Sequence, residues 1–183
     1  AKEKYKLIKN NCLCGGDNDI ILSLIDRHCV KFITVVCKNC GLIRAKDYFR
    51  NEDVEDFYKN FYRTIAYSEA YKALSTSEIF DLQKKNSKFK YDLINEYKIK
   101  PLNKLKIIDL GGGIGGVLDH FSSDNEKYLF DFYDPYLDFA KTKGIKSVKG
   151  GLDKVDFKAD IIILSHVVEH WNNFKNEIQK LIN

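Results

Sequence analysis

The chain has 183 residues, of which 44% are hydrophobic and 13% aromatic, so it can form a packed core and is not a disordered polypeptide. Its formal net charge is only +4, and the surplus lies in residues 1–50, which carry ten basic and five acidic groups. This mild excess is compatible with an anionic substrate but does not by itself indicate a nucleic-acid-binding protein. No segment has the length and apolar character of a membrane span or a signal peptide, so we expect a cytoplasmic protein with no membrane partner.

The five cysteines all lie in residues 1–50, and four of them form two close pairs. Cys37 and Cys40 make a C-x-x-C knuckle followed by glycine, a spacing at which two thiolates ligate one tetrahedral metal ion. Cys12 and Cys14 make a second pair that is one residue shorter than the usual spacing. Because a reducing compartment favours metal binding over disulfides, we expect a structural zinc site on these four residues, with four unliganded buried cysteines as the alternative.

Two apolar segments between the cysteine pairs, residues 20–25 and 30–36, are expected to form strands. Together with the two pairs they predict a zinc-ribbon-like unit over residues 1–50. Cys29, the cysteine left over, is expected to be a small buried residue in a strand.

Residues 51–103 have helical spacing and are expected to form a connector. One apolar pattern at i, i+3, i+4 and i+7 begins at Val54 and ends at Phe61, and a second runs from Phe89 to Tyr97. Pro101 then ends the second helix.

Residues 104–183 alternate short apolar runs with amphipathic stretches, which predicts a doubly wound α/β fold with a parallel sheet. The expected strands are residues 105–110, 127–133, 145–149 and 160–165. The expected helices are residues 115–122, 137–143 and 172–182, the second of them ending at Gly144 in a left-handed cap. Only these four strands fit before Asn183, so we expect the sheet to be incomplete at its C-terminal end.

A glycine-rich turn follows the first of these strands, where Asp109-Leu110 leads into Gly111-Gly112-Gly113-Ile114-Gly115-Gly116. A strand, a glycine turn and a helix in this order allow a ligand to approach the main chain closely. Gly111, Gly113 and Gly116 fit the G-x-G-x-x-G spacing of a dinucleotide site. Asp109, Gly111, Gly113 and Gly115 fit a different pattern, with an acidic residue two positions before the first glycine.

This second pattern resembles the first motif of class I S-adenosylmethionine-dependent methyltransferases, in which the acid helps to position the methionine part of the cofactor. The segments 132–145 and 159–170 look like later motifs of the same family, in the same order. The resemblance implies a Rossmann-like methyltransferase sheet that binds S-adenosylmethionine. It also implies that Asp134, at the end of the second strand, accepts the ribose hydroxyls, and that Asp153 and Ser165 lie near the cofactor.

The N-terminal half resembles a particular group of these enzymes, the bacterial methyltransferases of sugar, polysaccharide and natural-product pathways. They begin with a four-cysteine zinc unit and a connector rich in tyrosine and phenylalanine, which Cys37-x-x-Cys40-Gly41 and the segment 56–62 resemble here. The implied acceptor is a small polar molecule such as a nucleotide-linked sugar.

His166, Glu169 and His170 follow the last strand and form the one base-capable cluster near the expected site. Methyl transfer needs an aligned nucleophile and often a base, so either histidine is a candidate base, with Glu169 orienting its imidazole. The alternative is that Glu169 and His170 cap or pair locally at the start of a helix. The spelling H-x-x-E-H also matches an inverted zinc-protease signature, but His166 follows a buried strand directly and does not lie in a long amphipathic helix.

The sequence therefore predicts S-adenosylmethionine-dependent methyl transfer to a small acceptor. Three alternatives remain: a cofactor-binding scaffold without activity, an RNA methyltransferase, and an NAD-dependent dehydrogenase. Nucleic acid is disfavoured because residues 101–183, which contain the expected site, carry eleven basic and twelve acidic groups.

Overall fold

The computed structural model describes residues 5–26, 29, 31–57, 60, 73–171 and 174–182. By its internal contacts the chain divides into two compact units. The first, called here the N-terminal unit, consists of Ala1–Ala66 with Trp171–Asn183. The second, the α/β unit, consists of Tyr67–His170, so its first residue falls within the segment expected to be a connector.

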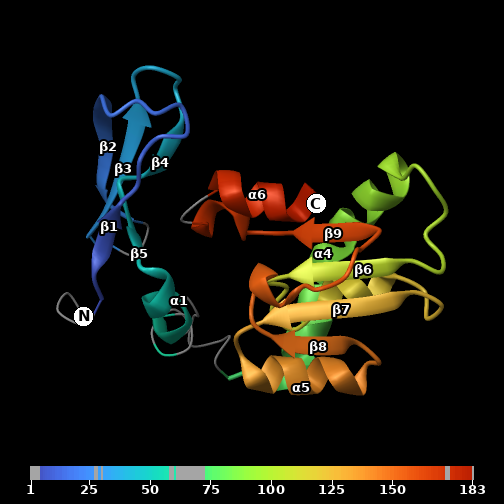
Figure 1. Cartoon of the computed structure of the whole chain (residues 1–183). Coiled ribbons are helices and arrows are strands. Elements are labelled where there is room, and N and C mark those ends of the chain that lie inside the picture. The colour runs from blue at the N-terminus through green and yellow to red at the C-terminus, as the bar shows by residue number, and fades with distance from the viewer. Residues whose placement is uncertain are drawn as a thin grey trace. The chain divides into compact units, whose positions relative to one another are not determined.

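The N-terminal unit contains two small antiparallel sheets (Figure 1). The sheet β2-β3-β4 carries the second cysteine pair, and β1 pairs with β5. The two strands expected between the cysteine pairs are confirmed as β2 and β3. The elements are β1 Leu7–Lys9, β2 Asp19–Ile25, β3 Lys31–Cys37, β4 Ile43–Ala45, β5 Asp47–Phe49, α1 Asn51–Phe57 and α6 Phe174–Ile182.

The prediction for Cys29 is wrong. This residue is exposed and lies between β2 and β3, with a left-handed φ of 58°. Its N–H donates to the carbonyl of Asp26 at 3.1 Å, which closes a turn. The chain reverses direction here, so Cys29 belongs to the hairpin connection and not to a strand.

Aromatic packing joins α1 to the small sheet β1-β5. The ring of Tyr5 meets those of Phe49 and Phe57 edge to face, at centroid distances of 5.6 and 6.0 Å. The Tyr5 hydroxyl also donates to the carboxylate of Asp56. Phe57 thus belongs to the expected helical pattern, whereas Tyr58 and Phe61 of that pattern lie outside the described residues.

The α/β unit holds a parallel sheet with the strand order β8-β7-β6-β9 (Figure 1). Because the order reverses between β6 and β9, the carboxyl ends of these two strands form the switch point of a doubly wound sheet. The fold class expected from the sequence is therefore confirmed. The elements are α4 Thr76–Tyr97, β6 Lys106–Leu110, η2 Gly116–His120, β7 Glu126–Asp131, α5 Asp134–Thr142, β8 Lys146–Lys149, η3 Leu152–Lys154, β9 Ile161–Leu164 and η4 Val168–His170.

Helix α4 begins with a capping box, in which Ser75 and Glu78 satisfy each other's backbone N–H groups. The helix ends at Tyr97, before Pro101, as expected. It packs against η2 and α5, and its partly buried Tyr91 and Ile94 contact a core formed around Ile107, Leu129 and Ile163 of the sheet.

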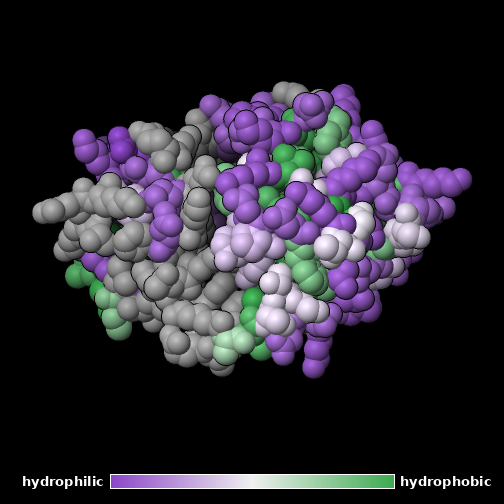
Figure 2. Space-filling view, turned by 90° about the horizontal axis from the view of Figure 1, so that it is seen from below, coloured by the Kyte–Doolittle hydropathy of each residue, from purple (hydrophilic) through white to green (hydrophobic). Residues whose placement is uncertain are grey.

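Helix α5 buries Tyr136, Leu137 and Ala140 and exposes charged residues such as Asp138 and Lys141. Hydrophilic residues accordingly make up most of the α/β surface in the view from below (Figure 2). Gly144, after the helix, has the expected left-handed φ of 73°.

Two expected elements differ in detail. The helix expected over residues 115–122 is a short 3₁₀ helix, Gly116–His120, and a Cβ on Gly116 would come within 2.5 Å of the backbone of α4 at Lys84. The strand expected to reach Tyr133 ends at Asp131, and α5 already begins at Asp134. Among the described residues, no helix is long and apolar enough to cross a membrane.

Candidate functional site

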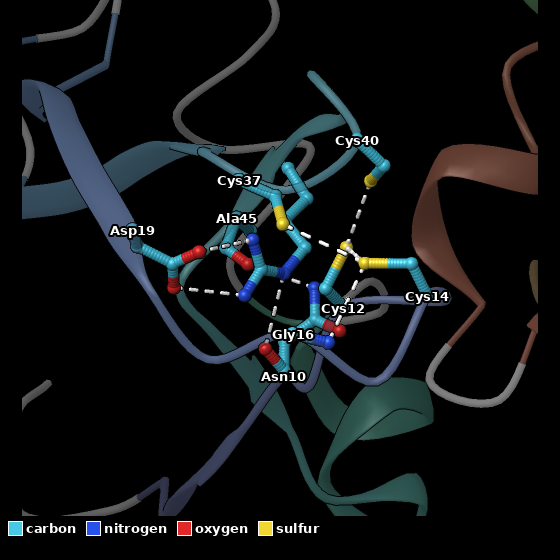
Figure 3. Close-up of polar contacts among 9 residues, drawn as sticks. Asn10, Cys12, Cys14, Gly16, Asp19, Cys37, Cys40 and Ala45 are labelled. Atoms are coloured by element: carbon cyan, nitrogen blue, oxygen red, sulfur yellow. Dashed lines mark hydrogen bonds and ion pairs between the residues drawn. The ribbon is translucent and has the colours of Figure 1, made fainter.

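The thiol groups of Cys12, Cys14, Cys37 and Cys40 converge, all within 4.8 Å of one another (Figure 3). The measured separations between sulfur atoms are 3.4 Å for Cys12–Cys40, 3.5 Å for Cys12–Cys14 and 3.7 Å for Cys14–Cys37. Tetrahedral zinc with Zn–S bonds of about 2.3 Å requires sulfur atoms about 3.8 Å apart. All five cysteines of the chain are free thiols, so this cluster fits a metal ion and is not a pair of disulfides.

Each cysteine pair is shaped by a backbone turn that ends in a glycine with left-handed φ. The N–H of Gly15 donates to the carbonyl of Cys12 at 2.9 Å, and the N–H of Gly41 donates to that of Cys37 at 2.8 Å. The N–H of Gly16 also reaches the Cys14 sulfur at 3.4 Å. The shorter Cys12–Cys14 spacing is therefore accommodated by its own turn.

Polar contacts behind the cluster hold the two cysteine segments together (Figure 3). Arg44 donates two hydrogen bonds to Asp19, at 2.8 and 2.9 Å, and a third to the carbonyl of Asn10 at 3.2 Å. The Asn10 side chain donates to the Ala45 carbonyl at 2.7 Å. Bidentate Arg–carboxylate pairs fix orientation well, so the segment before Cys12 is tied to β2 and β4.

Without a bound cation, the close packing of the four cysteines disfavours deprotonation of their thiol groups. The N–H of Leu42 lowers the pKa of the Cys40 thiol, but hydrogen bonds with Cys12 and Cys14 outweigh it and raise the pKa to about 12. A bound divalent cation would favour the deprotonated thiolates. The four residues could thus hold zinc as a structural ion.

The glycine loop of the α/β unit connects β6 to η2, at the switch point of the sheet. Gly111, Gly113 and Gly115 all have left-handed φ, between 62° and 82°. A Cβ on Gly112 would lie 2.1 Å from Asp109 Oδ2, so only glycine leaves room for the carboxylate beneath the loop.

Helix α4 holds the loop through Gln83, which sequence reasoning did not identify. Its side-chain nitrogen donates to the carbonyl of Gly112 at 3.1 Å, and its oxygen accepts from the N–H of Gly116 at 2.7 Å. A Cβ on Gly116 would come within 2.5 Å of the Lys84 backbone nitrogen. Gly116 is therefore required for the packing of α4 on the loop.

Asp109 is 2% exposed, and its Oδ1 has no hydrogen-bond partner among the described residues. Burial raises its pKa to about 7, the Lys90 ammonium opposes this shift, and the Asp131 carboxylate adds to it. Leaving a buried carboxylate oxygen without a partner costs free energy. This atom is available to a ligand.

The carboxylate at the end of β7 is Asp131, three residues before the predicted Asp134. Asp131 Oδ2 accepts from the N–H of Gly113 at 2.9 Å, and Oδ1 accepts from the N–H groups of Phe132 and Tyr133 at 2.8 and 3.0 Å. Asp134 begins α5 and pairs with Lys149 at 2.9 Å. The expectation that Asp134 ends the strand is therefore wrong, while its role toward a ligand stays a prediction.

Asp153 lies in η3, after the carboxyl end of β8. Its side chain is 65% exposed and pairs with the adjacent Lys154 at 3.4 Å. The structure thus brings Asp153 to the same edge of the sheet but not into the cavity described next.

A cavity of about 130 Å³ lies between α4, the glycine loop and the end of β9. Among its lining residues are the carboxylate of Asp109, the ammonium of Lys90 from α4 and the hydroxyl of Ser165 after β9. The Lys90 ammonium donates to the Ser165 hydroxyl at 2.6 Å. Ser165 was expected from the sequence, whereas Lys90 was not. The remaining lining residues are Gln83, Ser87, Gly111, Gly112, Val117 and His166.

The turn after β9 carries the predicted base cluster. His166 lines the cavity with a left-handed φ of 57°, a strained conformation for a residue other than glycine. Its Nδ1 lies 3.3 Å from Glu169 Oε1, so Glu169 orients His166. His170 is exposed, yet partial desolvation lowers its pKa below the ordinary value.

The strand order, glycine loop and buried acid define a doubly wound α/β domain with a candidate ligand site at its switch point. No protein-family model matches the sequence, and the search of curated proteins finds no match. Solved structures do match. The PH0226 protein of Pyrococcus horikoshii OT3 is 20% identical over 63% of this chain and 57% of its own, with a TM-score of 0.42.

Two further matches are plantazolicin methyltransferases solved with SAH and a desmethyl-plantazolicin analogue. BpumL is 16% identical over 69% of this chain and 49% of its own, with a TM-score of 0.44. BamL is 18% identical over 71% and 53%, with a TM-score of 0.42. This chain therefore spans about half the length of the solved proteins it matches.

Proposed function

We propose that the α/β unit binds S-adenosylmethionine at the carboxyl ends of β6 and β9, as part of an enzyme that methylates a small polar acceptor. The observation that carries the proposal is the buried Asp109 carboxylate, whose Oδ1 has no partner among the described residues and which lines a cavity beside the glycine loop. A bound ammonium group would supply the missing partner. The cofactor, when bound, supplies a methyl group on a positively charged sulfur.

The ribose is assigned to Asp131. A carboxylate at the end of the second strand of a doubly wound sheet can accept both ribose hydroxyls. Asp131 already accepts a hydrogen bond from the loop at Gly113, so ribose bound there would lie beside the glycines. Asp134, which is 55% exposed and paired with Lys149, is the alternative.

The proposed base is His166. It lines the cavity, and Glu169 holds its Nδ1 side, so Nε2 is left to accept a proton from an acceptor hydroxyl or amine. The strained backbone of His166 supports a role in function, because such strain persists where the surroundings enforce it. His170 remains the second candidate.

A nucleotide-linked sugar is the proposed acceptor, on the strength of the basic surplus in residues 1–50 and the resemblance of the cysteine unit and connector to sugar-modifying enzymes. The test is to incubate the chain with S-adenosylmethionine and, separately, a panel of sugar nucleotides and RNA, and to measure S-adenosylhomocysteine by mass spectrometry. Turnover with a sugar nucleotide supports the proposal. Turnover with RNA alone overturns the acceptor, and cofactor binding without turnover on any substrate favours a scaffold.

In the active enzyme, His166→Ala should lower the rate about 10²–10⁴-fold while cofactor affinity stays unchanged. The control is Lys154→Ala, an exposed residue outside the cavity. If His166→Ala and His170→Ala both methylate at the parental rate, neither histidine is the general base.

A further inference from the structure

An ion pair crosses the sheet β2-β3-β4 on the face that carries Cys37. In the strand register, Arg44 lies opposite Val35, and Asp19 lies opposite Cys37. Residues directly opposite each other in an antiparallel pair share a face of the sheet, and so do Val35 and Cys37, two residues apart on β3. Arg44 and Asp19 come from the two outer strands and bond at 2.8 and 2.9 Å, so their side chains meet across β3 beside Cys37.

The Arg44 guanidinium is a permanent positive charge with little contact to water. Its side chain is 7% exposed, and arginine stays protonated in proteins. Hydrogen bonds with Asp19 raise the pKa of the guanidinium, burial opposes this shift, and negative charge on Cys12 and Cys37 adds to it. The positive charge therefore acts on one residue of each cysteine pair.

The cysteine cluster needs such a charge once it holds a metal ion. A divalent cation bound by four thiolates leaves an excess of two negative charges. Cys14 and Cys40 are exposed, so water can stabilise part of this excess, whereas Cys12 and Cys37 are only 4% and 1% exposed. The two buried thiolates are the ones that Arg44 acts on.

We propose that Arg44 sets the metal affinity of the cysteine cluster, because its guanidinium compensates the excess negative charge of the four thiolates. Asp19 orients the guanidinium through the bidentate pair, and the carbonyl of Asn10 accepts a third hydrogen bond from it at 3.2 Å. The Asp19 carboxylate also opposes part of the compensation, so the two partners have opposite electrostatic effects on the metal ion. The inference concerns the N-terminal unit and does not depend on the cofactor of the α/β unit.

The opposite signs separate this role from a purely structural one. Competition of the 183-residue chain with a chromophoric zinc chelator at constant pH measures the affinity. Arg44→Gln should weaken zinc about ten- to a hundredfold, the usual effect of losing a group behind the metal ligands. Arg44→Lys keeps the charge and should recover most of this loss. Asp19→Asn removes only the opposing charge, so zinc should bind within about twofold of the parent or more tightly.

The matched control is Arg50→Gln. Arg50 pairs with Asp53 at 3.0 Å in the same unit, at the start of α1 and outside the strands that carry the cysteines. Its loss should leave the zinc affinity unchanged.

Cobalt(II) in place of zinc gives a second readout, which is measured at saturation and so does not depend on affinity. A nearby cation stabilises the sulfur lone pairs, so its removal should move the thiolate-to-cobalt charge-transfer absorption to longer wavelength. The shift should appear in Arg44→Gln and be absent in Arg50→Gln.

Equal losses of zinc affinity in Arg44→Gln and Asp19→Asn, with an unchanged cobalt spectrum, would overturn the inference, because the ion pair would then only hold the strands together. If Arg44→Gln does not fold, Asp19→Asn decides: parental or tighter binding supports the charge effect, and a loss of about tenfold or more overturns it. A parent chain that binds neither metal refutes the site, and the inference fails with it.

Discussion

The carboxylate of Asp109 lies directly beneath Gly112, so that a Cβ on Gly112 would come 2.1 Å from Asp109 Oδ2 and 2.8 Å from Leu129 Cδ1. A buried acid and the glycine that makes room for it thus form one unit of the loop. Either residue can be altered to test this relationship.

Gly112→Ala should displace the carboxylate and lower the free energy of unfolding by about 1–3 kcal/mol, the usual cost of overpacking. It should also abolish cofactor binding. The matched control is Gly144→Ala, where a Cβ meets open space and only the left-handed φ of 73° is strained. Equal affinities in Gly112→Ala and the parent, measured by titration, would mean that the carboxylate position is not needed for the ligand.

Asp109 should make stability depend on pH. Its pKa rises from 3.8 to about 7 on folding, so the folded chain binds more protons than the unfolded chain between these values. The free energy of unfolding should therefore fall as the pH rises from about 4 to about 7, by up to about 4 kcal/mol.

Asp109→Asn removes this titration, so the variant should gain stability relative to the parent as the pH rises across that window. Urea unfolding of both proteins at pH 5 and pH 8 measures the difference, in which the pH dependence of the cysteine cluster cancels. If the free energies of unfolding of the two proteins differ by the same amount at pH 5 and at pH 8, the raised pKa of Asp109 is contradicted.

Local patterns carried the sequence predictions that succeeded. The cysteine pairs and the strand before the glycine loop depend on residues close together in the chain, and the structure has them in the expected places. The parallel sheet was predicted as well, because alternating strands and helices restrict the topology, whereas the strand order comes from the structure alone.

Tertiary contacts explain what the sequence did not reveal. Phe132 and Tyr133 favour a strand by composition, but the Asp131 side chain accepts both of their N–H groups and ends the strand there. Gln83 and Lys90 belong to no motif, since they reach the site only because α4 packs against the loop.

The ribose assignment distinguishes two acidic residues. Asp131→Asn should weaken S-adenosylhomocysteine by about 2 kcal/mol, because a carboxylate accepts the two hydroxyls better than an amide does. Asp134→Asn, on an exposed side chain, should change affinity by less than about 0.5 kcal/mol. If calorimetry shows a larger loss of affinity in Asp134→Asn than in Asp131→Asn, Asp134 and not Asp131 binds the ribose.

The cysteine cluster should hold one zinc ion per chain. Cys37→Ser, at a buried position in the cluster, should reduce the zinc content well below one and destabilise the N-terminal unit. Cys29→Ser should retain full zinc, because Cys29 is exposed and outside the cluster. Elemental analysis of protein purified without chelator measures both, and a metal-free parent would refute the site.

Binding of S-adenosylmethionine at the switch point of this sheet is tested by a calorimetric comparison of S-adenosylhomocysteine with NAD. We expect one S-adenosylhomocysteine bound per chain, no measurable binding of NAD, and loss of the S-adenosylhomocysteine signal in Asp109→Asn. Binding of NAD in place of S-adenosylhomocysteine would assign the G-x-G-x-x-G spacing of Gly111, Gly113 and Gly116 to a dinucleotide and contradict the claim.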